Sequence, residues 1–264
     1  MTQADIEQDR CLHRVVRFEF GEGTPEGDYF EVDGNVVAGQ YRPLQPLVEA
    51  ELPDGNPPAA GLLITGLDSR DLEGFDPLYL QPTLDLGFNE GRIEPADGSF
   101  PASLQRVTPQ AAGAPQRLLV AAGQFQDLID GPGVQRVFTA IDGELYPVEH
   151  AGTTDAPGFT RVLGRVGEDE AVVQFDVGVD GPAERVYVLF REVPAGGFGG
   201  ATTSWRGVDL VPASSSSTTW LGGETISSAG ATVEFFVQAV GANGRVSISD
   251  NKVYNYLSAL PDET

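Results

Sequence analysis

The chain has 264 residues, of which 39 are acidic and 16 are basic, giving a formal net charge of −23. This length suffices for one large domain or two ordinary ones, and a hydrophobic content of 41% excludes a disordered chain, because enough apolar surface can be buried. The negative charge excludes nucleic acid and anionic lipid as favoured partners, and no apolar run reaches the roughly 18–20 residues of a membrane-spanning helix.

Residues 1–150 are predicted to form a β-rich domain with long loops. The 33 glycines and 19 prolines of the whole chain recur at short intervals, which is the spacing of strands and turns. We expect a β-sandwich whose topology the pattern does not define. The expected strands are Cys11–Phe20, Asp28–Val32, Val36–Arg42, Leu47–Leu52, Leu62–Thr65, Leu78–Leu80, Leu84–Phe88, Leu104–Thr108, Arg117–Phe125 and Val134–Ala140.

Residues 151–157 are small and polar and predict a linker. After them the pattern becomes regular, and residues 158–257 are predicted to form a seven-stranded immunoglobulin-like β-sandwich, followed by a tail at 258–264. The fold class is therefore expected to be all-β, with two β-sandwich domains. The expected strands of the second domain are Phe159–Val166, Ala171–Val179, Arg185–Glu192, Ser204–Val211, Ser217–Leu221, Thr232–Val240 and Arg245–Ser249.

Two more detailed predictions concern the last two of these strands, namely the turn between them and the direction of their side chains. The pair Asn243-Gly244 between them favours a tight hairpin with positive φ at both central turn positions. Along Thr232–Val240, alternate residues from Val233 to Ala239 are apolar and are expected to face one core. Phe236 lies on the other, mixed face, so we expect an edge contact or a neighbouring domain to cover it.

Residues Val233–Val240, Gly241–Arg245 and Ser249–Lys252 resemble the end of an immunoglobulin-like or fibronectin-III-like module. Such modules recur near the C-termini of large secreted bacterial multidomain proteins. The stretch Arg185–Arg191 and Trp205 are similar to the middle strands of that module, and Gln135–Phe138 with Gly143–Pro147 looks like the segment that joins it to a preceding β-domain. The resemblance implies an extracellular or cell-surface setting and a supporting or binding role.

The sequence offers little nucleophilic or acid–base chemistry. The only histidines are His13 and His150, and the only cysteine, Cys11, excludes an intramolecular disulfide and a Cys-based zinc cluster. No catalytic residue is predicted, and the chain is expected not to be an enzyme. Residues Met1–Asp5 lack the basic start and apolar stretch of a signal peptide, so the chain is expected to be cytosolic or the mature part of a longer protein.

Calcium is the only ion for which the sequence offers ligands, and no other cofactor is expected. Carboxylates are densest in a stretch that we expect to be a loop, and calcium prefers oxygen ligands. The competing interpretation is a solvated acidic loop that Arg70 partly neutralises. The candidate ligands are Asp68, Asp71, Glu73 and Asp76.

Aromatic side chains are the candidate ligand-binding residues. Exposed rings stack on sugars or fill pockets of a partner. Trp205 and Trp220 occur in the two expected strands that flank a serine-rich loop, with Phe198 nearby, and the candidates are Phe198 and Trp220. Trp205 is expected instead to be a core residue of the sandwich.

These observations predict a non-catalytic extracellular structural, adhesion or recognition module within a larger secreted or surface assembly, whose partner is a protein or a glycan. One alternative is a carbohydrate-binding accessory domain that uses Phe198 and Trp220. Another is a glycoside hydrolase that uses carboxylates of the N-terminal domain, since two acids flanking the scissile bond are the catalytic requirement.

Overall fold

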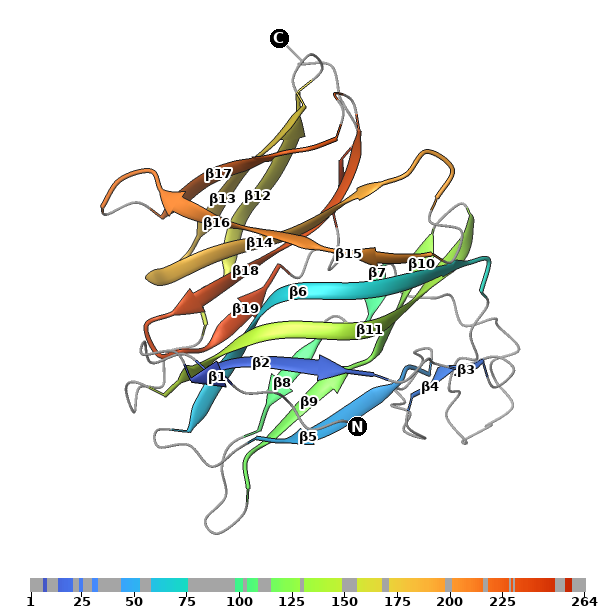
Figure 1. The fold of residues 1–264 in the computed structure, drawn as a ribbon. Coiled ribbons are helices and arrows are strands. Elements are labelled where there is room, and N and C mark those ends of the chain that lie inside the picture. The colour runs from blue at the N-terminus through green and yellow to red at the C-terminus, as the bar shows by residue number, and fades with distance from the viewer. Residues whose placement is uncertain are drawn as a thin grey trace, which may run out of the picture.

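The structure is a computed structural model, and it describes residues 7–8, 14–20, 24–25, 30–32, 44–52, 58–75, 98–101, 104–108, 115–128, 131–148, 156–167, 171–197, 201–215, 218–227, 229, 231–249 and 255–257. Every regular element within these ranges is a β-strand, so the predicted all-β class is confirmed. Figure 1 shows the N-terminal strands in the lower part of the molecule and the C-terminal strands in the upper part.

A seven-stranded antiparallel sheet forms the middle layer. Its longest strands, β6 and β11, pair with each other from Ala59 to Glu73, and β2 and β10 pair with successive halves of β11. The strands of this sheet are β1 (Glu7–Gln8), β2 (Arg14–Glu19), β6 (Ala59–Glu73), β7 (Gly98–Phe100), β10 (Gly123–Leu128), β11 (Gly131–Pro147) and β15 (Thr202–Ser204).

A three-stranded sheet of β5 (Leu47–Glu51), β8 (Gln105–Val107) and β9 (Arg117–Ala121) lies below the middle sheet. The chain passes from β9 into β10 of the middle sheet at Ala122, where it turns a corner. A side chain at Gly123 would lie 2.7 Å from the ring of Pro46, so only glycine allows this close approach. A short pair is formed by β3 (Thr24–Pro25) and β4 (Phe30–Glu31). We call the strands from β1 to β11 the first part of the structure.

The second part, which comprises the strands between Phe159 and Leu257 other than β15, is an eight-stranded sheet that curls around its own hydrophobic core. Strand β16 pairs with both β14 and β17 and so joins the two halves of the curl. The core between the halves includes Phe175, whose ring centroid lies 5.9 Å from that of Phe190 and 5.1 Å from that of Phe235. The strands are β12 (Phe159–Val166), β13 (Val172–Val179), β14 (Ala183–Val193), β16 (Arg206–Pro212), β17 (Thr219–Thr225), β18 (Thr232–Gly241), β19 (Val246–Ile248) and β20 (Asn255–Leu257).

The seven strands predicted after residue 158 are all present, with one division. The predicted strand Ser204–Val211 is split at Trp205 into β15, which joins β6 of the first part, and β16, which stays in the second part. The hairpin of β18 and β19 is confirmed. Its turn is different from the prediction, because the amide of Gly244 donates to the carbonyl of Gly241, which places Ala242 and Asn243 at the centre and the positive φ of 75° on Gly244 after them.

Predictions for the first part were less complete. Strand β6 extends well past the predicted Leu62–Thr65, and the predicted strand Arg117–Phe125 is divided between two sheets at Ala122. The predicted strands Val36–Arg42, Leu78–Leu80 and Leu84–Phe88 lie outside the described residues.

One of the two hydrophobic cores among the described residues contains residues of both parts, and the other lies within the second part. Strand β18 turns Val233 and Phe235 toward the core of the second part, while Phe236 is fully buried in a cluster with β6 and β11 of the first part. Phe236, for which an edge contact or a neighbouring domain was expected as cover, is thus covered by residues of the first part. The division at residues 151–157 stays a prediction, and residues 151–155 lie outside the described part of the chain.

Gln238 links the two parts through the backbone of β6. Its side-chain amide accepts from the N–H of Ile64 at 2.9 Å and donates to the carbonyl of Ile64 at 2.7 Å. These are the two bonds that a neighbouring strand would make, so the glutamine satisfies backbone groups that would otherwise be buried without partners.

Candidate functional site

Four buried charged side chains form a closed network where the two parts meet. Arg136 of β11 binds Asp71 of β6 through two parallel hydrogen bonds of 2.8 Å each. Arg191 of β14 lies 2.5 Å from Asp71 and 2.6 Å from Glu234 of β18. The fourth side of the network is the 2.9 Å contact between Arg136 and Glu234. Each part of the chain therefore supplies one arginine and one acid.

The network is buried and electrically balanced. None of the four side chains is more than 3% exposed, and two positive charges face two negative ones. Trp205 covers both arginines, since its ring centroid lies 5.3 Å from the guanidinium carbon of Arg136 and 4.8 Å from that of Arg191. Because each of these buried charges is engaged by two partners of opposite sign, the arrangement links the two parts.

Asp71 is ionised at neutral pH because of these neighbours. Burial raises the pKa of Asp71, but the guanidinium of Arg136 and then that of Arg191 outweigh burial and hold the pKa below its ordinary value. A carboxyl whose pKa is lower in the folded state contributes stability above the unfolded pKa, near 4, and loses it as pH falls through the folded pKa.

Asp71→Asn is therefore expected to cost stability at neutral pH, with the difference from wild type shrinking as pH falls below about 4. Urea unfolding of both proteins from pH 7 to pH 2 measures this difference. The exposed ion pair of Arg161 and Asp176 provides the control, since Asp176→Asn should change little at any pH. A difference for Asp71→Asn that stays constant down to pH 2 would contradict the role given to its charge.

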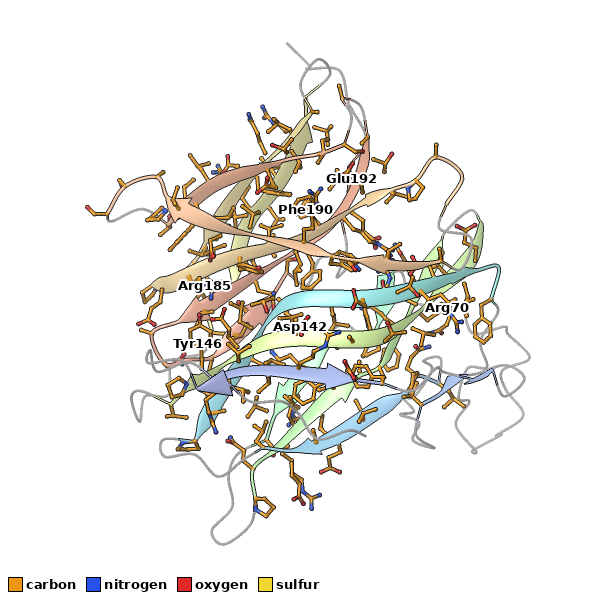
Figure 2. The ribbon with its side chains drawn as sticks, viewed as in Figure 1. Arg70, Asp142, Tyr146, Arg185, Phe190 and Glu192 are labelled. Carbon is orange, nitrogen blue, oxygen red and sulfur yellow. The ribbon has the colours of Figure 1, made fainter. Side chains whose placement is uncertain are left out.

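A second polar contact joins the parts nearer the surface. Arg185 of β14 lies 2.8 Å from Glu144 and 3.1 Å from the hydroxyl of Tyr146, both in β11, and is bound to Asp209 of β16 (Figure 2). Burial alone lowers the pKa of Arg185, but its hydrogen bonds to Asp209 and Tyr146 raise that pKa above its ordinary value. Arg185 therefore stays charged and adds to the fixed contact.

The predicted calcium ligands lie in a different setting from the one expected. Asp68, Asp71 and Glu73 belong to strand β6 and not to a loop, because the stretch pairs with β11 along its whole length. Asp71 is held by two arginines, and Ser204 donates to Asp68 at 2.6 Å. Asp76 lies outside the described residues. Within the described ranges, no three His, Cys, Asp or Glu side chains gather into a group that could hold a metal ion. The calcium site stays a prediction.

The predicted aromatic residues do not form a surface in the described structure. Trp220 is only 7% exposed and packs in the core of the second part, so its ring is not offered for stacking. Phe198 lies outside the described residues. The prediction that Trp205 is a core residue is confirmed, with 5% exposure and its indole N–H donating to Ser69 at 3.2 Å.

An open hollow of about 520 Å³ lies on the outer face of β12, β13 and β17. Its central row crosses three strands in register, with Asp176 placed directly opposite both Leu163 and Leu221. In the next row Gln174 is opposite Arg165 and Gly223. Gly223 leaves the hollow open, and a side chain there would lie 2.6 Å from the carbonyl oxygen of Val173.

The polar side chains of the hollow differ in whether they already have a hydrogen-bond or ion-pair partner. The side chains of Arg165 and Gln174 form no ion pair or hydrogen bond with the part of the chain that the structure describes. Asp176 is bound through Oδ1 to Arg161 at 2.5 Å. Leu163 and Leu221 are 43% and 41% exposed, which is high for leucine. Polar groups without a described partner and exposed leucines therefore line this hollow together.

Sequence reasoning did not identify the members of either site. A signal for the hollow exists in the alternation of Leu163 with Arg165 and of Gln174 with Asp176, which marks one face of each strand. No local signal identifies the buried network, since its members are separated by 43 residues or more along the chain.

No family model matches this chain, and no curated protein matches it. Among solved structures, the complex of Porphyromonas gingivalis RgpB pro- and mature domains gives a TM-score of 0.42 with 13% identity, covering 58% of this chain and 88% of that chain. A likeness this low carries no argument about function. Within the described residues, no helix is long and apolar enough to cross a membrane. The class that fold and site define is an all-β protein whose two parts are joined by a buried charge network.

Proposed function

We propose that this chain is a non-catalytic structural or recognition module of an extracellular assembly, which holds its two parts in one fixed orientation. The observation that carries the proposal is the buried network of Asp71, Arg136, Arg191 and Glu234. The two contacts that cross between the parts, Arg136 to Glu234 at 2.9 Å and Arg191 to Asp71 at 2.5 Å, favour one placement of β6 and β11 against β14 and β18.

The geometry of the network supports fixed orientation more strongly than it supports high stability. Taking charges out of water is costly, and a buried ion-pair network contributes less net stability than well-packed apolar residues of similar volume often do. A displacement of the two parts would break the contacts of Arg136 with Glu234 and of Arg191 with Asp71, where no side chain is more than 3% exposed, and weakening buried charge pairs is costly in free energy. A spacer or a module that presents a surface needs this property.

The test is a distance measurement between spin labels on the two parts. Labels at Glu51→Cys in β5 and Val211→Cys in β16, in a Cys11→Ser background, occupy exposed positions on opposite parts. We expect one narrow distance distribution that is unchanged by molar salt. A broad or divided distribution would overturn the fixed orientation. Turnover of an ester, peptide or glycoside that survives repurification and is lost on one carboxylate substitution would overturn the non-catalytic assignment.

The alternatives, a glycoside hydrolase and a carbohydrate-binding domain, differ in the support that they receive. A general acid needs a carboxyl whose pKa is raised, whereas the buried Asp71 has a lowered pKa and two arginine partners. The hollow on β12, β13 and β17 supports recognition, although through other residues than Phe198 and Trp220.

A further inference from the structure

We infer that the hollow on β12, β13 and β17 is a binding site for a sugar that carries a single carboxylate, such as a hexuronate residue of a glycan. Arg165 would bind the carboxylate, Gln174 and Asp176 would bind ring hydroxyls, and Leu163 and Leu221 would contact the apolar face of the ring. This goes beyond the proposed function, because a module can hold a fixed orientation without binding a small ligand.

Arg165 is the residue that points to a carboxylate. The chain has 39 acidic and 16 basic residues, so carboxylates are in excess and most arginines of the structure can find one. Arg165 nevertheless has no ion pair or hydrogen bond among the described residues, while Arg161, four residues before it, is paired with Asp176. A planar guanidinium that lies at the wall of a hollow and has no partner among the described residues is suited to bind a carboxylate with two parallel hydrogen bonds.

The other polar groups lie at distances that suit one ring. Gln174 is directly opposite Arg165 across the ladder, which places their Cβ atoms about 5 Å apart. Asp176 follows two residues after Gln174 on the same face, at about 7 Å. The Gln174 amide can donate and accept, and the carboxylate of Asp176 can accept a hydroxyl in addition to its bond with Arg161. Three groups so close together match the substituents of a single pyranose.

The hollow favours a sugar over an extended peptide. Peptides that bind a sheet gain most of their affinity from backbone hydrogen bonds at a free edge. In the hollow, the backbone groups of the central strand β13 are engaged in the ladders to β12 and β17, so binding over this strand depends on side chains. The volume of about 520 Å³ lies in the range of small-ligand sites.

The charge of the whole chain limits the ligand to one carboxylate at a time. A net charge of −23 repels polyanions at long range, and Glu168, Asp169 and Glu170 come one residue after the end of β12 in the sequence. Arg165 can offset one negative charge at short range, but the hollow holds no second unpaired cation among the residues that line it. Densely sulfated or phosphorylated chains therefore do not fit.

The test is a titration of the full ¹⁵N-labelled chain with methyl β-D-glucuronide, followed by amide chemical shifts at about 0.15 M salt, where long-range repulsion is screened. Methyl β-D-glucoside is the matched neutral probe, because it differs only by a hydroxymethyl group in place of the carboxylate. We expect saturable shifts at Leu163, Arg165, Gln174 and Leu221 with the glucuronide, and binding of the glucoside weaker by about tenfold.

Arg165→Gln is expected to weaken glucuronide binding about tenfold and to leave glucoside binding unchanged. Arg106→Gln is the control, since Arg106 is an exposed arginine of β8 that also has no ion pair among the described residues. Equal binding of the two sugars, equal loss in the two variants, or no saturable shifts would each overturn the inference. So would tighter binding of N-acetyl-leucyl-aspartate amide, which would assign the hollow to a peptide. All residues of the hollow lie in the second part, so these results and the spin-label distances are independent.

Discussion

Arg136→Met is expected to lower the free energy of unfolding by about 3–5 kcal/mol, because it leaves the buried network with one uncompensated negative charge. Asp71 and Glu234 then share Arg191 alone, in a site where each acid is at most 3% exposed. Methionine has a volume near that of the arginine side chain, so the loss is mainly electrostatic. At this chain length the same change lowers the melting temperature by about 6–20 °C.

Two further variants separate the buried charge from charge in general. Arg117→Met removes an exposed arginine that is paired with Glu49, and it should leave the melting temperature nearly unchanged. Arg136→Lys keeps the charge but loses the two parallel bonds to Asp71, so its stability should fall between those of wild type and Arg136→Met. Thermal melts of the three variants measure these differences. A melting temperature for Arg136→Met close to that of Arg117→Met would contradict the network's importance.

The network also explains why the prediction of a loop was wrong at Asp68–Glu73. Closely spaced carboxylates with few apolar residues indicate a solvated loop when each residue is judged by its neighbours in the chain. Strand β6 tolerates Asp71 because Arg136 and Arg191 neutralise it from 65 and 120 residues away. Long-range pairing of this kind leaves no local pattern, so neither strand β6 at these residues nor the buried network could be predicted from local sequence patterns.

In the second part, the local sequence pattern was sufficient to predict most strands. The strands of the second part alternate between a core face and a second face, and their predicted limits agree closely with β12, β13, β14 and β18. Even the irregularity at Phe236 was informative, because a large apolar residue on a polar face needs a cover. What the pattern did not show is that the cover comes from β6 and β11, and that Glu234 and Gln238 beside it are buried as well.

Phe236→Ala is expected to lower the free energy of unfolding by about 3–5 kcal/mol, the usual cost of removing a fully buried ring. Its ring lies 5.7 Å from that of Trp205, which covers the two arginines of the network. The cavity would therefore loosen Trp205 and, through it, the contact between the parts. Phe235→Ala provides a matched control, because Phe235 is as deeply buried but faces Phe175 in the core of the second part.

Both variants should lose similar stability in urea, whereas only Phe236→Ala should broaden the distance distribution between labels at Glu51→Cys and Val211→Cys. Stability and orientation are separable here because neighbouring residues of one strand face different cores. Equal broadening in both variants would mean that general loosening, and not the shared core, controls orientation. Broadening in neither would mean that the charge network fixes the two parts without help from the packing around Trp205.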